Sequence, residues 1–163
     1  MRSQILLACV LIMAIIAHAR SSENVREFEG HTYTIVVDKK NWQMANRDAQ
    51  SRGGYLVEIS SPKEQRFLEK FIDDHLKEKI TPIWIGLTDE ELEGEWKWTN
   101  GMPLVFTNWQ KNQPSNNNSI TPEHYCVIWH KNERVGAKKG QWNDVAGDNN
   151  LPYIIEFESL ENR

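Results

Sequence analysis

Only two cysteines occur among the 163 residues, and their positions limit how the chain can be held together. Cys9 lies in an apolar run over residues 5–16, which follows Arg2 and precedes the small-x-small triplet at 17–19. This order is typical of a secretory signal peptide cleaved after residue 19. Cys126 would then be alone in the mature chain. No internal disulfide could form, although the chain would enter an oxidising compartment, so its stability must come from packing.

The same apolar run also indicates where the protein is located. It covers 12 residues, whereas a helix needs about 20 apolar residues to span a bilayer. No second run of this kind occurs downstream. We therefore expect a signal peptide over residues 1–19, one domain over residues 20–163, and a secreted, extracellular protein without a membrane anchor. The mature chain is large enough to bury one core and too short for a second domain.

Charge and motifs argue against several classes of function. The formal net charge is −4 and the basic residues are dispersed, so a nucleic-acid partner has no electrostatic support. The sequence contains neither HExxH nor GxSxG and no paired metal-ligand histidines, so we do not expect an enzyme. Seven tryptophans fit a chain that is stabilised by packing, because each can bury roughly 150–250 Å².

The first half of the chain carries one strand signal and two helix signals. Residues 32–37 alternate and are β-branched, which predicts a strand, and residues 42–52 have helical spacing that ends at Gly53-Gly54. Ser61 is typical of an N-cap, with Pro62 at the first helical position and Glu64 as the capping-box acid. The apolar face of this second helix contains Phe67, Leu68, Phe71, Ile72 and Leu76.

The second half changes to short apolar segments separated by Gly, Pro and Asn. The segments at 84–87, 96–98, 127–129 and 153–155 predict strands. Residues 107–123, rich in Asn, Pro and Ser, predict a long irregular loop. Early helices followed by late strands indicate an α+β domain.

The order of several segments resembles the C-type lectin-like domain over essentially the whole mature chain. These segments are Trp42, Gly53-Gly54-Tyr55-Leu56-Val57-Glu58-Ile59, Glu64, Trp84-Ile85-Gly86-Leu87, Glu93-Gly94-Glu95-Trp96-Lys97-Trp98, Asn108-Trp109, Gln113-Pro114-Ser115, Glu123, Trp142-Asn143-Asp144 and Ile155-Glu156. The resemblance implies two helices packed on small antiparallel sheets with a long irregular ligand-binding loop. Under this fold, Trp84, Trp96 and Trp98 are expected in the core.

The family's two disulfides have no cysteines here. By resemblance, Ala49 and Ile155 occupy the first bridge, as an apolar pair that can pack together. Gly147 occupies one end of the second bridge, opposite Tyr125 or, in an alternative register, Cys126. We favour Tyr125, because a large residue would then face a small one and Glu123 would fall at the family's calcium-ligand position.

The resemblance also implies a calcium site that binds sugar. Its ligands, for both calcium and carbohydrate, would be Gln113, Ser115, Glu123, Asn143 and Asp144, with a cis Gln113–Pro114 bond. Gln-Pro-Asp members tend towards galactose-type sugars and Glu-Pro-Asn members towards mannose-type sugars, and Gln113 resembles the former. Ser115 departs from both patterns, which predicts weaker calcium binding. An accessory calcium site would use Asp89, Glu93 and Asn116, although His124 holds a position that is usually acidic.

Two functions remain open. The first is a secreted, calcium-dependent lectin for surface glycans, for example in microbial recognition and innate immunity. The alternative is a calcium-independent lectin-like domain that binds protein, ice or mineral surfaces. The sequon at Asn117 allows a glycan there. Residues 131–139 favour a solvated polar hairpin, and an added contact surface is the alternative. Since a single shallow sugar site is weak, clustering is expected, and a homo-oligomer would have to form through the face of the domain.

Overall fold

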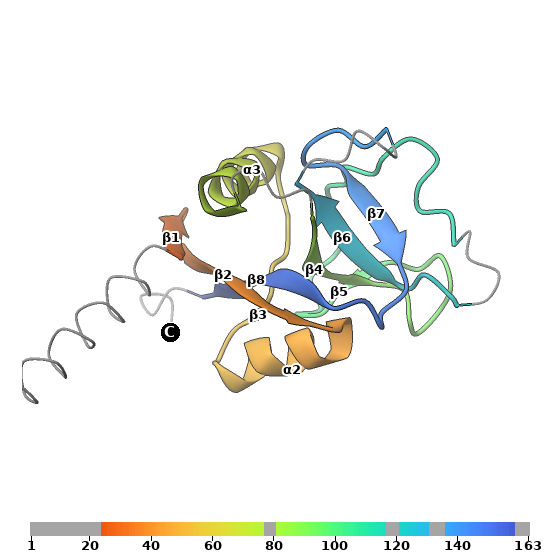
Figure 1. The fold of residues 1–163 in the computed structure, drawn as a ribbon, viewed down its shortest axis with the longest axis horizontal. Helices are drawn as coiled ribbons and strands as arrows, with labels where there is room; N and C mark the ends of the chain where they lie inside the picture. Colours follow the sequence, from red (N-terminus) through yellow and green to blue (C-terminus); the bar gives the residue numbers. More distant parts are fainter. Residues whose placement is uncertain (1–23, 77–80, 117–120, 131–135, 159–163) are drawn as a thin grey trace, which may run out of the picture.

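The computed structural model describes residues 24–76, 81–116, 121–130 and 136–158 (Figure 1). The predicted signal peptide, the Asn117 sequon and the first part of the 131–139 hairpin lie outside these ranges. Within them, no helix combines the length and the apolar character needed to cross a bilayer.

The described elements are two helices and eight strands. They are β1 (Val25–Phe28), β2 (His31–Lys40), α2 (Trp42–Ser51), β3 (Tyr55–Leu56), α3 (Pro62–Leu76), β4 (Pro82–Thr88), β5 (Lys97–Trp98), β6 (Tyr125–Trp129), β7 (Trp142–Val145) and β8 (Leu151–Phe157). The predicted strands and both helices are confirmed. The sequence-based description missed β1, β3 and β7.

The strands form one mixed sheet in the order β1-β2-β8-β4-β6-β7, with β3 added to β8 and β5 added to β4. Neighbouring strands are antiparallel except β4 and β8, which pair in parallel at Trp84 and Tyr153. This parallel contact joins the terminal strands to the loop-bearing strands, so the expected small antiparallel sheets are continuous.

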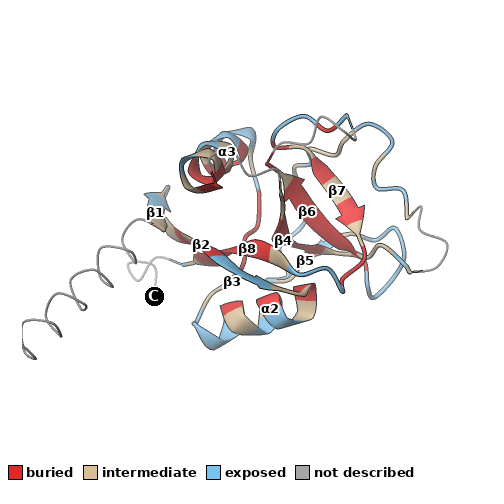
Figure 2. Cartoon of the chain, in the orientation of Figure 1, coloured by how far each residue is buried: buried red, intermediate tan, exposed pale blue. Residues whose placement is uncertain are grey.

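The two helices cover opposite faces of β2 and β8 (Figure 1). Successive side chains of a strand point to opposite faces, and β8 follows this rule: Ile154 packs in the core cluster with α3, while Tyr153 and Ile155 pack in the cluster with α2. Strands β4, β6 and β8 are buried along most of their length (Figure 2). They form a rigid support for the loops at the β7 end.

Both helices begin at side-chain caps. The Asn41 side chain accepts the Met44 N–H at 2.9 Å, and the Ser61 hydroxyl accepts the Glu64 N–H at 3.1 Å. The Glu64 carboxylate reaches back to the N–H and hydroxyl of Ser60, which is one residue earlier than in a standard capping box. Its other oxygen accepts the Tyr33 hydroxyl at 2.7 Å, so the cap also connects α3 to β2.

Packing replaces covalent links at both predicted bridge positions. Ala49 and Ile155 are fully buried in the same core cluster. A Cβ atom built on Gly147 would lie 2.4 Å from Cε2 of Tyr125, so the tyrosine ring fills the space above the glycine. Cys126 packs in the cluster on the other face of the sheet. The Tyr125 register is therefore confirmed, and the alternative Cys126 register is wrong.

The tryptophans predicted for the core are buried to different extents. Trp84 and Trp98 are 0% and 3% exposed, as expected. Trp96 is only partly buried, because it lies at the edge of the core against Trp109, with ring centroids 4.9 Å apart. Trp142 is completely buried.

Candidate functional site

Trp142 anchors the long loop to the core. Its N–H donates to the Asn108 carbonyl, and its own carbonyl accepts the Gln110 N–H, so the loop runs beside the start of β7. The indole Nε1 donates to Oε1 of Gln65 on α3 at 2.9 Å. With its indole fixed in this way, Trp142 sets the positions of Asn143 and Asp144, the next two residues of β7.

Asp144 ties the loop to the sheet. The residue is 1% exposed, and its Oδ2 accepts the N–H groups of Ser115 at 2.8 Å and Asn116 at 2.6 Å. These two bonds bring together parts of the predicted site that are 28 and 29 residues apart in sequence. The carboxylate therefore has a structural function in addition to any role as a ligand.

The turn before Ser115 has the predicted geometry. The Gln113–Pro114 bond is cis, which confirms that expectation. The Gln113 N–H donates to the Gln110 carbonyl at 2.9 Å, and Asn112 and Asn116 adopt positive φ angles of 67° and 42°. Asparagine tolerates this left-handed region better than most residues. The Asn-rich composition of the loop thus has a local conformational reason.

Two acceptor oxygens at this site have no donor among the described residues. They are Oε1 of Gln113 and Oδ1 of Asp144, and both are inaccessible to solvent. Buried polar atoms usually have a hydrogen-bond partner, because an unsatisfied one costs about 1–3 kcal/mol. A pair of unpartnered oxygens, one of them on a carboxylate, fits a cation better than it fits a sealed core.

The remaining predicted ligands are Asn143, Glu123 and Ser115. The Asn143 amide nitrogen donates to the Asp144 carbonyl at 2.6 Å, which leaves the Asn143 oxygen as the acceptor end of the amide. The Glu123 N–H donates to Oδ1 of Asn116 at 2.9 Å, and the Glu123 side chain is partly buried. Ser115 is exposed and contributes its N–H to Asp144. These residues offer carboxylate, amide and hydroxyl oxygens, which is the donor type that calcium takes in its shell of six to eight ligands.

The residues predicted for an accessory ion form a different arrangement. One ligand atom from each of Asp89, Glu93 and His124 lies within 4.8 Å of the others. Nδ1 of His124 is 3.0 Å from Oδ1 of Asp89 and 3.5 Å from Oε2 of Glu93. The Asn116 amide nitrogen donates to the same Glu93 oxygen at 2.6 Å. Nitrogen groups thus face both carboxylates.

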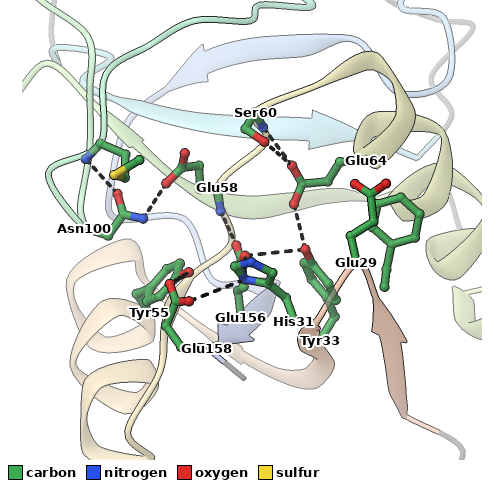
Figure 3. A pocket seen from close by; sticks show the side chains of 12 residues that line it. Glu29, His31, Tyr33, Tyr55, Glu58, Ser60, Glu64, Asn100, Glu156 and Glu158 are labelled. Carbon is green, nitrogen blue, oxygen red and sulfur yellow. Dashed lines mark hydrogen bonds and ion pairs between the residues drawn. The ribbon is translucent and has the colours of Figure 1, made fainter. Parts of the chain in front are cut away.

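An acidic cavity of about 300 Å³ lies away from the loop, between β2, β8 and the start of α3 (Figure 3). Its carboxylates belong to Glu29, Glu58, Glu64, Glu156 and Glu158, and its other polar groups include His31, Tyr33, Tyr55 and Asn100. This cavity was not predicted from the sequence. The available signal was Glu156, which lies within an otherwise apolar strand and, by alternation, on the same face as Ile154.

Burial dominates the electrostatics of this cavity. Glu156 is 3% exposed, and desolvation raises its pKa to about 8, with further repulsion from Glu64 and Glu58. Its Oε2 accepts the Glu58 N–H at 3.0 Å, and its Oε1 lies 2.8 Å from Nδ1 of His31. Burial likewise raises the pKa of Glu58, whose carboxylate accepts a hydrogen bond from Asn100. These contacts link β2, β8 and the loop after β5.

Two helices on opposite faces of a mixed sheet, with a Trp-Asn-Asp strand holding a loop that contains a cis X-Pro bond, define the class of C-type lectin-like domains. The family model described as "Lectin C-type domain" matches residues 38–157. The chain therefore belongs to the C-type lectin domain family.

Individual relatives agree with this membership. The chain is 33% identical to the human versican core protein over 130 residues, which is 80% of this chain and 3% of that protein. The carbohydrate-recognition domain of the mouse scavenger receptor C-type lectin has a TM-score of 0.69 at 30% identity, covering 83% of this chain and 94% of its own. The corresponding domain of cow CD23, solved in the presence of a GlcNAc2Man3 oligosaccharide, has a TM-score of 0.70 at 28% identity, covering 84% and 95%.

Proposed function

We propose that this chain is a secreted lectin that binds carbohydrate through one calcium ion held by Gln113, Ser115, Glu123, Asn143 and Asp144. The observation that carries the proposal is the pair of buried acceptor oxygens, Oε1 of Gln113 and Oδ1 of Asp144, without a donor among the described residues. Membership of the C-type lectin domain family supports it. So does the similar domain of cow CD23, which was solved in the presence of an oligosaccharide.

Bound calcium would supply an electrophilic centre with coordination positions left for two neighbouring sugar hydroxyls. The protein's own groups would select among sugars by direct hydrogen bonds. Carboxylates can only accept hydrogen bonds from hydroxyls, whereas amides both donate and accept them. Gln113 at the first position is the feature that favours galactose-type over mannose-type sugars, and a glycan-coated or microbial surface is the proposed target.

The test is a calcium titration of residues 20–163 by calorimetry, followed by galactose and mannose columns eluted with a chelator. We expect calcium uptake and calcium-dependent retention on galactose. Asp144→Ala should reduce calcium affinity at least 100-fold, because it removes a buried carboxylate oxygen. Asp148→Ala is the matched control, since Asp148 is exposed four residues further along and should leave uptake unchanged. Absence of uptake in the unmodified protein at millimolar calcium would refute the proposal.

Ser115 gives a second, more specific test. The change Ser115→Asp replaces the hydroxyl with a carboxylate. It should tighten calcium binding by about tenfold, because ligand charge tunes the affinity of such sites. The double change Gln113→Glu with Ser115→Asn should move the sugar preference towards mannose. Unchanged affinity in the first variant would indicate that residue 115 does not face the ion.

One observation favours the alternative of a calcium-independent lectin-like domain for protein, ice or mineral surfaces. Oδ2 of Asp144 is already satisfied by two backbone N–H groups, so this carboxylate has a use without an ion. If the loop keeps its conformation in chelator and no sugar column retains the protein, this second function is favoured. A homo-oligomer formed through the face of the domain would compensate for weak single sites in either case.

A further inference from the structure

Four side chains beside the loop, Asp89, Glu93, Asn116 and His124, satisfy one another by hydrogen bonds. We propose that they form a metal-free clamp, in which Asn116 and His124 are positioning residues that hold Ser115 and Glu123 in place for calcium and sugar. This inference rests on the proposed function for its purpose. Its contacts can be tested independently of that function.

The clamp joins three segments of the chain. His124, the residue before β6, contacts Asp89 in the turn after β4, with Nδ1 and Oδ1 3.0 Å apart. Asn116, from the long loop, donates to Glu93 in the same turn at 2.6 Å. The second oxygen of Asp89 accepts the Gly94 N–H at 2.8 Å. Both carboxylates therefore face donors that belong to the protein.

The direction of the Asn116 amide excludes it as an oxygen ligand for a cation between these carboxylates. Its Oδ1 accepts the Glu123 N–H at 2.9 Å, so its nitrogen must face Glu93. Turning the amide around would lose both bonds, because its nitrogen cannot accept from the Glu123 N–H and its oxygen cannot donate to the Glu93 carboxylate. Since calcium selects oxygen ligands, the expected accessory calcium site at Asp89, Glu93 and Asn116 does not fit this arrangement. The imidazole and amide nitrogens occupy the place of the ion.

The clamp residues are the immediate neighbours of two proposed ligands. Ser115 precedes Asn116, whose N–H also bonds to Asp144, and Glu123 precedes His124. The His124 carbonyl accepts the Thr88 hydroxyl at 2.8 Å and the Asp89 N–H at 3.2 Å. Backbone and side-chain bonds thus fix residues on both sides of the proposed calcium site. A site that is fixed before binding loses less conformational freedom when the ligand arrives.

Amide hydrogen exchange in the presence of chelator tests the clamp directly. The Glu123 amide should be protected without calcium, because its acceptor is the Asn116 side chain. Asn116→Ala should remove this protection, while Lys111→Ala, an exposed change in the same loop, should keep it. His124→Leu should reduce amide protection at the start of β6. His124→Asn should restore this protection, because the asparagine nitrogen can reach the position of Nδ1. Equal exchange in the unmodified protein and Asn116→Ala, or protection only with calcium, would overturn the proposal.

Binding measurements separate this inference from the proposed function. The unmodified protein should take up one calcium ion, and Asn116→Ala should weaken its affinity about tenfold without changing the preferred sugar. Uptake of a second calcium ion, or of zinc, that disappears in His124→Leu would overturn the metal-free clamp. If no ion is taken up at all, the proposed function fails, and the exchange experiment alone decides whether the clamp exists.

Discussion

Replacing Glu156 with glutamine should change how the stability of the fold depends on pH. Glu156 is 3% exposed, and its pKa is raised from 4.5 to about 8, mainly by burial. The carboxyl group is therefore held protonated in the folded state at pH values where the unfolded chain has lost the proton. Glutamine has nearly the same shape and cannot ionise, so it imitates the protonated form.

The sign follows from proton linkage. Between pH 4.5 and about 8 the folded state binds more protons at Glu156 than the unfolded state, so the free energy of unfolding falls as the pH rises. The stabilising contribution is complete below pH 4.5 and is lost as the pH passes through 8. At 1.36 kcal/mol per pKa unit, the loss is at most about 5 kcal/mol. This is a large share of the 5–15 kcal/mol that is typical of whole domains.

Urea unfolding at pH 5, 7 and 9, followed by tryptophan fluorescence, measures this effect. We expect Glu156→Gln to match the unmodified protein at pH 5 within about 1 kcal/mol and to be more stable by about 2–5 kcal/mol at pH 9. Glu158→Gln is the control, because that side chain lines the same cavity but is 52% exposed. Parallel pH profiles for the unmodified protein and Glu156→Gln would refute the assignment of a buried, neutral carboxyl group.

Three further changes test the packing. Gly147→Ala should destabilise the fold by about 1–3 kcal/mol in chemical denaturation, because its Cβ would lie 2.4 Å from the Tyr125 ring. An unchanged denaturation midpoint would mean that the ring moves freely. The double change Ala49→Cys with Ile155→Cys, in a Cys126→Ala background, should form a disulfide that mass spectrometry detects. Because the closed loop is long, this disulfide should stabilise the fold by up to about 5 kcal/mol. Two free thiols after oxidation would contradict the assigned bridge position. Glu64→Ala should lower stability by about 1–3 kcal/mol more than Lys63→Ala does, because it removes the acceptor of the Ser60 N–H and the nearer of the two acceptors of the Tyr33 hydroxyl. Equal melting temperatures for the two variants would argue against this cap.

The parts of the fold predicted from sequence are those whose signals are local. The second helix was identified from Ser61, Pro62 and Glu64, because caps and periodicity lie within one segment. The strands β1, β3 and β7 have only two to four residues each, which is too short for a clear alternating pattern. In addition, β3 pairs with β8, which is distant in sequence. For β7, the pairing with β6 decides the structure, and the Asn-Asp sequence by itself is equally typical of a turn.

The candidate site also has features that could be predicted from the sequence and features that could not. The cis bond at Pro114 and the register of Tyr125 against Gly147 could be predicted from motif order. The Asp144 contacts could not, because backbone N–H groups of Ser115 and Asn116 carry no sequence signature. The acidic cavity was missed because its members come from distant segments, and a single glutamate in an apolar strand does not reveal its neighbours.

The bridge positions without disulfides and the metal-free clamp have one feature in common: contacts within the protein take the place of a disulfide or an ion. At Gly147 and Ala49, packing contacts stand at the positions where the family resemblance implies disulfides. At His124 and Asn116, protein nitrogens stand where an ion was expected. Neither arrangement depends on an oxidant or a cation in the surroundings. Gln113 and Asp144 differ, because each keeps a buried oxygen without a described donor. Chelator and reductant should therefore leave the fold intact, and calcium should matter at this one place, where sugar is proposed to bind.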